Sequence, residues 1–155
     1  MVGSILWNSK KYRGKTLEWI LFHDPGYIAW MVGKGIKAAG AEWEFDELVA
    51  KASHLKIPGT CYYCRKDAIT RMALFQHPSG GLTSIEFFCT ACEPQSGHYL
   101  MVRPSMLVSE ELKSYDKLGG KLLMRTIRHA YELPKVLRQT DLERFFATKA
   151  NFTLP

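Results

Sequence analysis

Four cysteines in two pairs carry the clearest chemical signal in this sequence. Cys61 and Cys64 form one pair, Cys89 and Cys92 form the other, and each pair encloses two residues. This spacing lets both thiolates of a tight turn reach one ion, and four thiolates complete the tetrahedral shell that structural zinc prefers. The pairs are 24 residues apart (65–88), slightly more than the about 15–20 residues common in such sites. The pattern predicts one structural Zn²⁺ with no open position for a substrate.

Three other uses of the cysteines remain open at this stage. Two disulfides would need an oxidising compartment, but the chain shows no secretory leader and we expect it to be cytoplasmic. A redox dithiol needs only one such pair. An iron–sulfur cluster also accepts four cysteines, and spacing alone does not distinguish it from zinc.

The segment between the cysteine pairs is typical of a zinc-ribbon β-hairpin. Residues 68–75 and 82–88 are rich in β-branched and apolar side chains, and the turn residues 77–81 separate them. Residues 98–102 can add a third strand. His77 and His98 are read as turn and strand-edge residues because four thiolates already complete the site. A hairpin of this size is marginal without a staple, so we expect the metal to be needed for folding.

Composition indicates a folded protein, and the helices expected before and after the hairpin in the chain place it in the α+β class. Hydrophobic residues make up 46% of the 155 residues, and no apolar run approaches the ~18 residues of a membrane span. The formal net charge is +6, which suits a polyanionic partner but also an ordinary soluble protein. We divide the chain into an N-terminal module with its linking helix (1–58), the ribbon (59–104) and a helical tail (105–155).

A cluster of cations around one tyrosine precedes the first expected helix. It consists of Lys10, Lys11, Tyr12, Arg13 and Lys15. Thr16 is a good N-cap for a helix over 17–22, and Asp24 followed by Pro25 is typical of a second helix start. Backbone amides at the Thr16 helix start, beside these cations, would suit a phosphate group, and Tyr12 could stack on a base or sugar. The alternative is a solvated basic turn.

The same stretch resembles a known family through two short motifs. KYRGKTL at residues 11–17 and DPGYIAW at residues 24–30 are similar to the small C-terminal domain appended to exodeoxyribonuclease X and to related phage and bacterial proteins. The resemblance covers roughly residues 4–36. It implies a nucleic-acid-associated accessory module rather than a nuclease, because the exonuclease domain has no counterpart here.

Residues 41–55 are expected to form the linking helix. Its apolar positions recur at helical spacing from Phe45 to Leu55, while its other face is acidic and should not meet a phosphate backbone. Pro58 follows it.

The tail is expected to contain two helices. After Gly119-Gly120, three cations recur on one helical face, namely Lys121, Arg125 and Arg128, and such a face can lie along a phosphate backbone. Residues 140–143 (Thr-Asp-Leu-Glu) predict a capping box for the last helix. Phe145 and Phe146 on that helix either dock on the core or form a dimer contact.

No arrangement of paired carboxylates, nucleophile with histidine, or open-shell metal site is recognisable, so we expect a protein without catalytic activity. The leading interpretation is a zinc-binding, nucleic-acid-binding accessory protein of a nuclease, recombination or mobile-element system, from a bacterium or phage. DNA is favoured over RNA, a larger nuclease or recombination protein is a possible partner, and a membrane is not expected. The main alternative is a zinc-ribbon adaptor that binds another protein. An enzyme whose site is assembled from scattered histidines and acids is the third.

Overall fold

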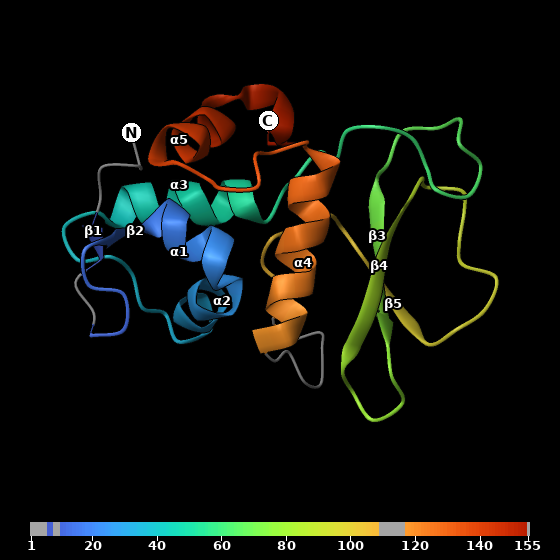
Figure 1. Ribbon diagram of the computed structural model, residues 1–155, viewed down its shortest axis with the longest axis horizontal. Helices are drawn as coiled ribbons and strands as arrows, with labels where there is room; N and C mark the ends of the chain where they lie inside the picture. Colours follow the sequence, from blue (N-terminus) through green and yellow to red (C-terminus); the bar gives the residue numbers. More distant parts are fainter. Residues whose placement is uncertain (1–5, 8–9, 109–116, 155) are drawn as a thin grey trace.

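Helices and strands occupy separate stretches of the chain, which confirms the α+β class. The computed structural model describes residues 6–7, 10–108 and 117–154. The described helices are α1 (Leu17–His23), α2 (Pro25–Gly33), α3 (Glu42–Ala52), α4 (Lys117–Ala130) and α5 (Gln139–Ala147), followed by a short 3₁₀ turn at Lys149–Asn151. The described strands are β1 (Leu6–Trp7), β2 (Lys15–Thr16), β3 (Arg71–Gln76), β4 (Leu82–Phe88) and β5 (Tyr99–Val102). Figure 1 shows the helices gathered on one side of the molecule and β3, β4 and β5 on the other.

The first two helices begin at the caps that the sequence predicts. Thr16 Oγ1 accepts a hydrogen bond from the backbone N–H of Trp19, and Asp24 Oδ1 accepts one from that of Tyr27. These bonds satisfy donors that have no partner inside the helix. A short strand also lies on each side of the basic turn, because β1 pairs antiparallel with β2.

The cysteine module (residues 59–104) is built on a three-stranded antiparallel sheet in the order β4-β3-β5. The predicted strand at 68–75 begins later, at Arg71, and pairs with both neighbours. Because side chains alternate along a strand, Met72 and Leu74 join the main core with the helices. The intervening Ala73 joins a second, smaller cluster with Phe88 and two of the cysteines. One face of the sheet therefore belongs to the helices and the other to the cysteines.

Helix α4 is the element that joins the helical part to the sheet. It lies between the other helices and β3–β5 in Figure 1, and it contacts β4, α1 and α2. We expected this helix to start after Gly119-Gly120, but it starts at Lys117 and both glycines are buried within it. Leu123 and Ile127 are fully buried in the main core.

The other two helices differ from expectation at their ends. α3 spans Glu42–Ala52 and stops before Leu55, whose backbone instead bridges Phe152. The capping box expected over 140–143 lies two residues earlier, because the N–H of Arg138 donates to Asp141 Oδ2 at 2.9 Å and the helix starts at Gln139. The expected box paired Thr140 with Glu143, whereas the observed one pairs Arg138 with Asp141, and Thr140 is inside the helix.

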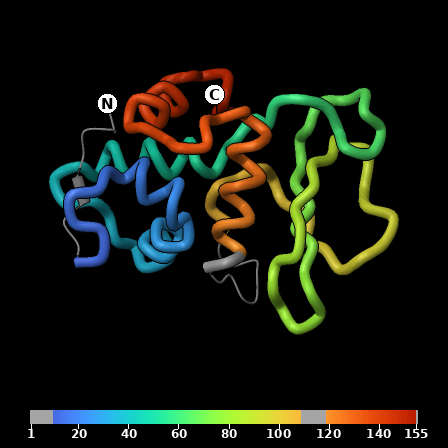
Figure 2. Tube along the Cα trace, viewed as in Figure 1, coloured from blue at the N-terminus to red at the C-terminus, as the bar shows by residue number. Residues whose placement is uncertain are grey.

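The C-terminal segment packs on the N-terminal helices rather than extending from them. Figure 2 shows its path across the first helices, and α5 contacts α1. Phe145 and Phe146 are both about 4% exposed, and their rings meet Phe22 edge to face. Of the two roles considered for this pair, docking on the core is the one observed.

The part of the chain described here contains no helix that combines the length and the apolar character needed to cross a membrane.

Glu18 is an acidic residue placed inside the core. It is 1% exposed, and its Oε2 atom has no hydrogen-bond partner among the described residues. Burial raises the pKa of this carboxyl from 4.5 to about 7, and the charge of Glu143 adds to the effect. The charged form is therefore disfavoured in the folded protein, and stability should fall as pH rises from 4.5 to 7.

We expect Glu18→Gln to stabilise the protein above pH 7 and to have little effect near pH 4.5. At about 1.4 kcal/mol per pKa unit, the gain at about pH 8 should be roughly 3 kcal/mol, or an increase of roughly 5–10 °C in melting temperature. Thermal melts at both pH values measure it. An equal gain at both would show that the effect does not come from ionisation.

Candidate functional site

The four cysteines form one compact cluster that could bind a metal ion. Their four Sγ atoms all lie within 4.8 Å of one another, and Cys64 Sγ lies 4.0 Å from Cys89 Sγ. Sulfur atoms bound 2.3 Å from a tetrahedral ion are about 3.8 Å apart, so small adjustments would close the shell. Cys61 and Cys89 are buried, whereas Cys64 and Cys92 are half-buried. No histidine joins the cluster among the described residues, in agreement with the interpretation of His77 and His98.

The first cysteine turn is fixed by backbone hydrogen bonds to the segment that follows it and to β4. Cys61 N–H donates to Asp67 O at 2.8 Å, and Tyr62 N–H donates to Phe87 O of β4 at 2.9 Å. Arg65 N–H donates to Cys61 O at 2.9 Å and closes the turn, with φ of 57° at Arg65. This left-handed conformation costs a non-glycine residue about 1–2 kcal/mol, and the turn maintains it through these bonds.

Arg71 organises the second cysteine turn from the start of β3. Its Nε donates to Cys89 O at 3.1 Å, and another guanidinium nitrogen donates to Cys92 O. The same side chain pairs with Glu93 at 3.4 Å. The rigid fork of donors in arginine suits this bridging of several acceptors. Sequence reasoning missed Arg71, because only the pairing of β3 with β4 brings it beside the second pair.

The thiols of the cluster do not have equal acidity. Burial opposes ionisation of Cys61, but backbone N–H groups of Cys64, Cys89 and Tyr63 lower its pKa to about 6. A hydrogen bond with Cys89, followed by burial, raises the pKa of Cys92 to about 12. The Cys61 thiol therefore loses its proton easily, whereas ionisation of the Cys92 thiol is opposed by its neighbours. A divalent cation would remove that opposition, because it replaces protons with positive charge at the centre of the cluster.

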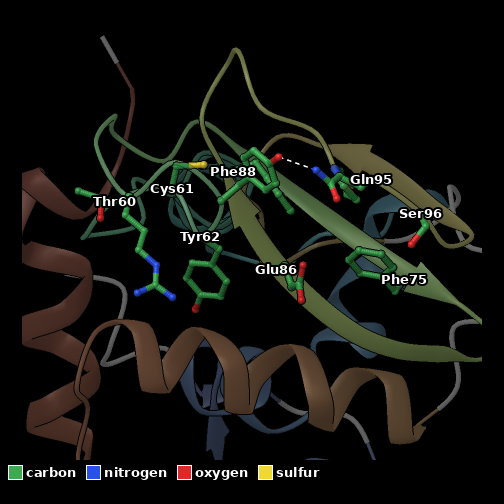
Figure 3. A pocket seen from close by; sticks show the side chains of 11 residues that line it. Thr60, Cys61, Tyr62, Phe75, Glu86, Phe88, Gln95 and Ser96 are labelled. Carbon is green, nitrogen blue, oxygen red and sulfur yellow. Dashed lines mark hydrogen bonds between the residues drawn. The ribbon is translucent and has the colours of Figure 1, made fainter.

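A groove of about 760 Å³ opens beside the cysteine cluster, on the face of the sheet that carries the smaller core. Figure 3 shows Phe75 and Glu86 on the sheet and Gln95 on a loop at its rim. The Gln95 amide donates to the hydroxyl of Tyr63 at 2.5 Å and so links the first cysteine turn to that loop. Tyr62 and Tyr63 are 49% and 55% exposed, so both residues enclosed by the first pair reach the surface.

The basic turn (residues 10–15) lies between β1 and β2, and its cations have different surroundings. Lys10 and Arg13 are exposed and make no ion pair within the described part of the chain. Lys11 forms an ion pair with Asp24 at 3.0 Å, and Lys15 lies 4.6 Å from the centroid of the Trp19 ring.

Tyr12 is half-buried, and its hydroxyl donates to Asp24 Oδ2 at 2.5 Å. Burial opposes ionisation of Asp24, but the hydrogen bonds from Tyr12 and Lys11 keep the pKa of its carboxyl below the usual value. The ring of Tyr12 packs against those of Trp19 and Tyr27. Its proposed contact with a nucleic acid stays a prediction.

The three cations predicted on the tail helix meet in a second groove, the basic groove. Its volume is about 530 Å³, and Lys121, Arg125 and Arg128 line it together with Phe22, His23, Met124, His129, Leu133, Pro134 and Lys135. Lys121 and Arg125 are exposed, whereas Arg128 is half-buried and donates to the carbonyls of Pro134 and Lys135. Arg128 thus shapes the rim. No carboxylate lines this groove among the described residues.

Three cationic or titratable residues of the basic groove were not found from the sequence. His129 and Lys135 come from the end of α4 and the turn after it, and His23 comes from the end of α1. His129 directly follows Arg128, so helical periodicity did not place it on the same helical face as the three predicted cations. His23 meets α4 only through tertiary packing, and Lys135 only because the chain turns back after α4, so neither belongs to the helical pattern of that segment.

Loss of one thiol from the cluster should remove the bound metal and destabilise the cysteine module. We expect Cys61→Ser to cost on the order of 4 kcal/mol or more, because the smaller core consists largely of the thiols and their immediate neighbours. Metal content and thermal melts measure this, with a strong chelator as the second arm. Tyr63→Phe, inside the same turn, is the matched control and should keep the metal. A Cys61→Ser protein as stable as its parent would contradict a structural site.

Comparison of the chain with models of known protein families, with curated proteins and with solved structures finds no significant match. The resemblance of residues 4–36 to the exodeoxyribonuclease X C-terminal domain therefore stays a prediction that rests on its two motifs alone.

Proposed function

We propose that this protein is a zinc-binding, nucleic-acid-binding accessory protein, in which one structural Zn²⁺ supports the fold and the basic groove holds the phosphate backbone. DNA is placed ahead of RNA because residues 4–36 resemble a domain appended to a deoxyribonuclease. The same resemblance motivates a place in a nuclease, recombination or mobile-element system of a bacterium or phage.

The basic groove is the observation that carries this proposal. Three cations and two histidines from α1 and α4 line it, a further cation follows at Lys135, and no described carboxylate faces them. Outer helix faces usually mix both signs of charge, and a concave surface lined by one sign concentrates the field on a ligand of the opposite sign. Phosphate groups provide that sign at regular intervals along a nucleic acid.

Zinc is the metal that best fits the cysteine cluster. Four thiolates with Sγ atoms within 4.8 Å of one another match the closed tetrahedral shell of structural zinc. Such a shell has no free position, which assigns the metal to folding rather than to chemistry. Two buried and two half-buried ligands are consistent with that role.

Binding of a partner protein is the second candidate function, and one observation favours it. The groove beside the cysteine cluster is bordered by Tyr62 and Tyr63, which are about half exposed, and exposed tyrosines are enriched at protein interfaces. This groove carries both Glu86 and Arg65, so it offers no single sign of charge to a phosphate chain. An adaptor would use this face and leave the basic groove without a role.

Removal of charge from the basic groove tests the proposal. In one variant Lys121, Arg125 and Lys135 become alanine, while Arg128 is kept because it supports the rim. The salt slope of nucleic-acid binding should decrease by roughly one unit per lost phosphate contact, with weaker affinity for every sequence. Gel shifts over a salt series, with DNA and RNA in parallel, measure both.

The control variant removes the same charge elsewhere, through alanine at the exposed Lys56, Lys66 and Lys149. These three lysines line neither groove and lie outside the basic turn. Equal losses in both variants would attribute binding to net charge alone and contradict a role for the basic groove. A folded, metal-containing parent that binds no nucleic acid would refute the proposed function itself.

Elemental analysis of purified protein identifies the metal. We expect about one zinc per chain, because four thiolates complete one shell. Iron with acid-labile sulfide would instead show an iron–sulfur cluster and would contradict the zinc assignment.

A further inference from the structure

Five aromatic rings from the N-terminal segments form one continuous row. In spatial order they are His23, Trp19, Tyr12, Tyr27 and Trp30, and successive ring centroids lie 3.9, 6.1, 5.1 and 5.7 Å apart. His23 and Trp19 are stacked with an interplanar angle of 10°, while the other pairs are tilted or edge to face. We call this arrangement the aromatic row.

Local helix geometry and one carboxylate place these rings. Trp19 and His23 are four residues apart on α1, and Tyr27 and Trp30 are three apart on α2, so each pair shares one helical face. Tyr12 comes from the basic turn and joins the two pairs. Its hydroxyl is bonded to Asp24, which also caps α2 and pairs with Lys11.

Two lysines of the basic turn lie over the rings of the aromatic row. Lys11 Nζ is 5.1 and 5.5 Å from the ring centroids of Tyr12 and Tyr27, and Lys15 Nζ is 4.6 Å from that of Trp19. Aromatic rings interleaved with cations are what a strand with exposed bases and a charged backbone requires, because the rings stack on bases while the cations meet phosphates.

The aromatic row ends at the basic groove on one side and at an exposed ring on the other, which suggests a path for a ligand. At one end His23 is exposed and also lines the basic groove, with its Nδ1–H bonded to Trp19 O at 2.8 Å. At the other end Trp30 is 49% exposed, although it is a large apolar side chain on a short helix. The aromatic row thus extends from the half-exposed Trp30 to the basic groove.

We infer that the aromatic row is a stacking platform for single-stranded nucleic acid, whose bases lie against Trp30 and its neighbours while its backbone continues into the basic groove. This inference rests on the proposed function and adds the strandedness of the ligand. A duplex has its bases stacked on one another and offers only phosphates, so it could use the basic groove but not the row. We assign to Trp30 the stacking role that the sequence suggested for Tyr12. The ring of Tyr12 packs between those of Trp19 and Tyr27, and its hydroxyl is hydrogen-bonded to Asp24.

Trp30→Ala tests the inference against Trp43→Ala as the matched control. Trp43 lies on α3, is 71% exposed, and is not part of the aromatic row. Loss of one stacked base should weaken binding of a thymidine or uridine oligomer by roughly 5- to 150-fold, because stacking contributes about 1–3 kcal/mol per base. Duplex affinity should not change. Trp30→Phe keeps a ring and should recover most of the loss. Fluorescence anisotropy with single-stranded DNA, single-stranded RNA and duplex DNA provides these values.

The outcomes separate the inference from the proposed function on which it rests. If duplex and single strands bind, lose affinity in the basic-groove variant, and are unaffected by Trp30→Ala, the inference is wrong and the proposed function stands. Equal effects of the Trp30 and Trp43 variants would also overturn it. If the folded, metal-containing parent binds none of the probes, the proposed function and the inference both fail. Unchanged metal content and melting temperature in the variants exclude loss of folding as the cause.

Discussion

The need to bring four thiols from two distant turns around one point constrains the whole cysteine module. The second pair follows β4 directly, and the first is tied to β4 through the hydrogen bond from Tyr62 to Phe87. Both turns are therefore positioned by the last residues of β4. A metal ion would hold the two turns together, since it cross-links the two ends of a hairpin that has little core of its own on that face.

The opposite face of the same sheet links this constraint to the rest of the molecule. Met72, Leu74, Ile85 and Phe87 share one apolar cluster with α1, α4 and α5. Helix α4 packs on β4 through one side and presents Lys121 and Arg125 on another. The position of the basic groove is thus set by the sheet on which α4 rests, although no cysteine lines that groove.

The features that were predicted correctly from the sequence are those that depend on residues close together in the chain. The cysteine pairs, the caps at Thr16 and Asp24 and the strands between the cysteines each depend on residues a few positions apart, and all were found. The misplaced start of α5 shows the limit of such signals, because Thr140 and Arg138 both precede an acidic residue and only the backbone path decides between them. Glu18 was not recognised as buried, since its neighbours in sequence are typical of an amphipathic helix.

Contacts between residues far apart in the sequence could not be predicted in this way, and the candidate sites depend mainly on such contacts. Arg71 reaches the second cysteine turn across a strand pair, and His23 reaches α4 from another helix. The aromatic row is the clearest case, because three segments that are separate in the sequence bring its rings together. Nothing local distinguishes Trp30, which is half exposed, from Trp19 and Tyr27, which are half-buried.

Asp24 shows how stability and binding are connected in this part of the fold. Its carboxylate caps α2, accepts from Tyr12 and pairs with Lys11, and these contacts favour its ionised form. Each contact alone is a modest surface interaction, but together they align two helices, the basic turn and the middle of the aromatic row. A residue that reads in the sequence as a helix cap is therefore also the positioning group of the proposed platform. The contacts of Asp24 hold Tyr12 in the middle of the row, whereas Trp30 at its end is half exposed.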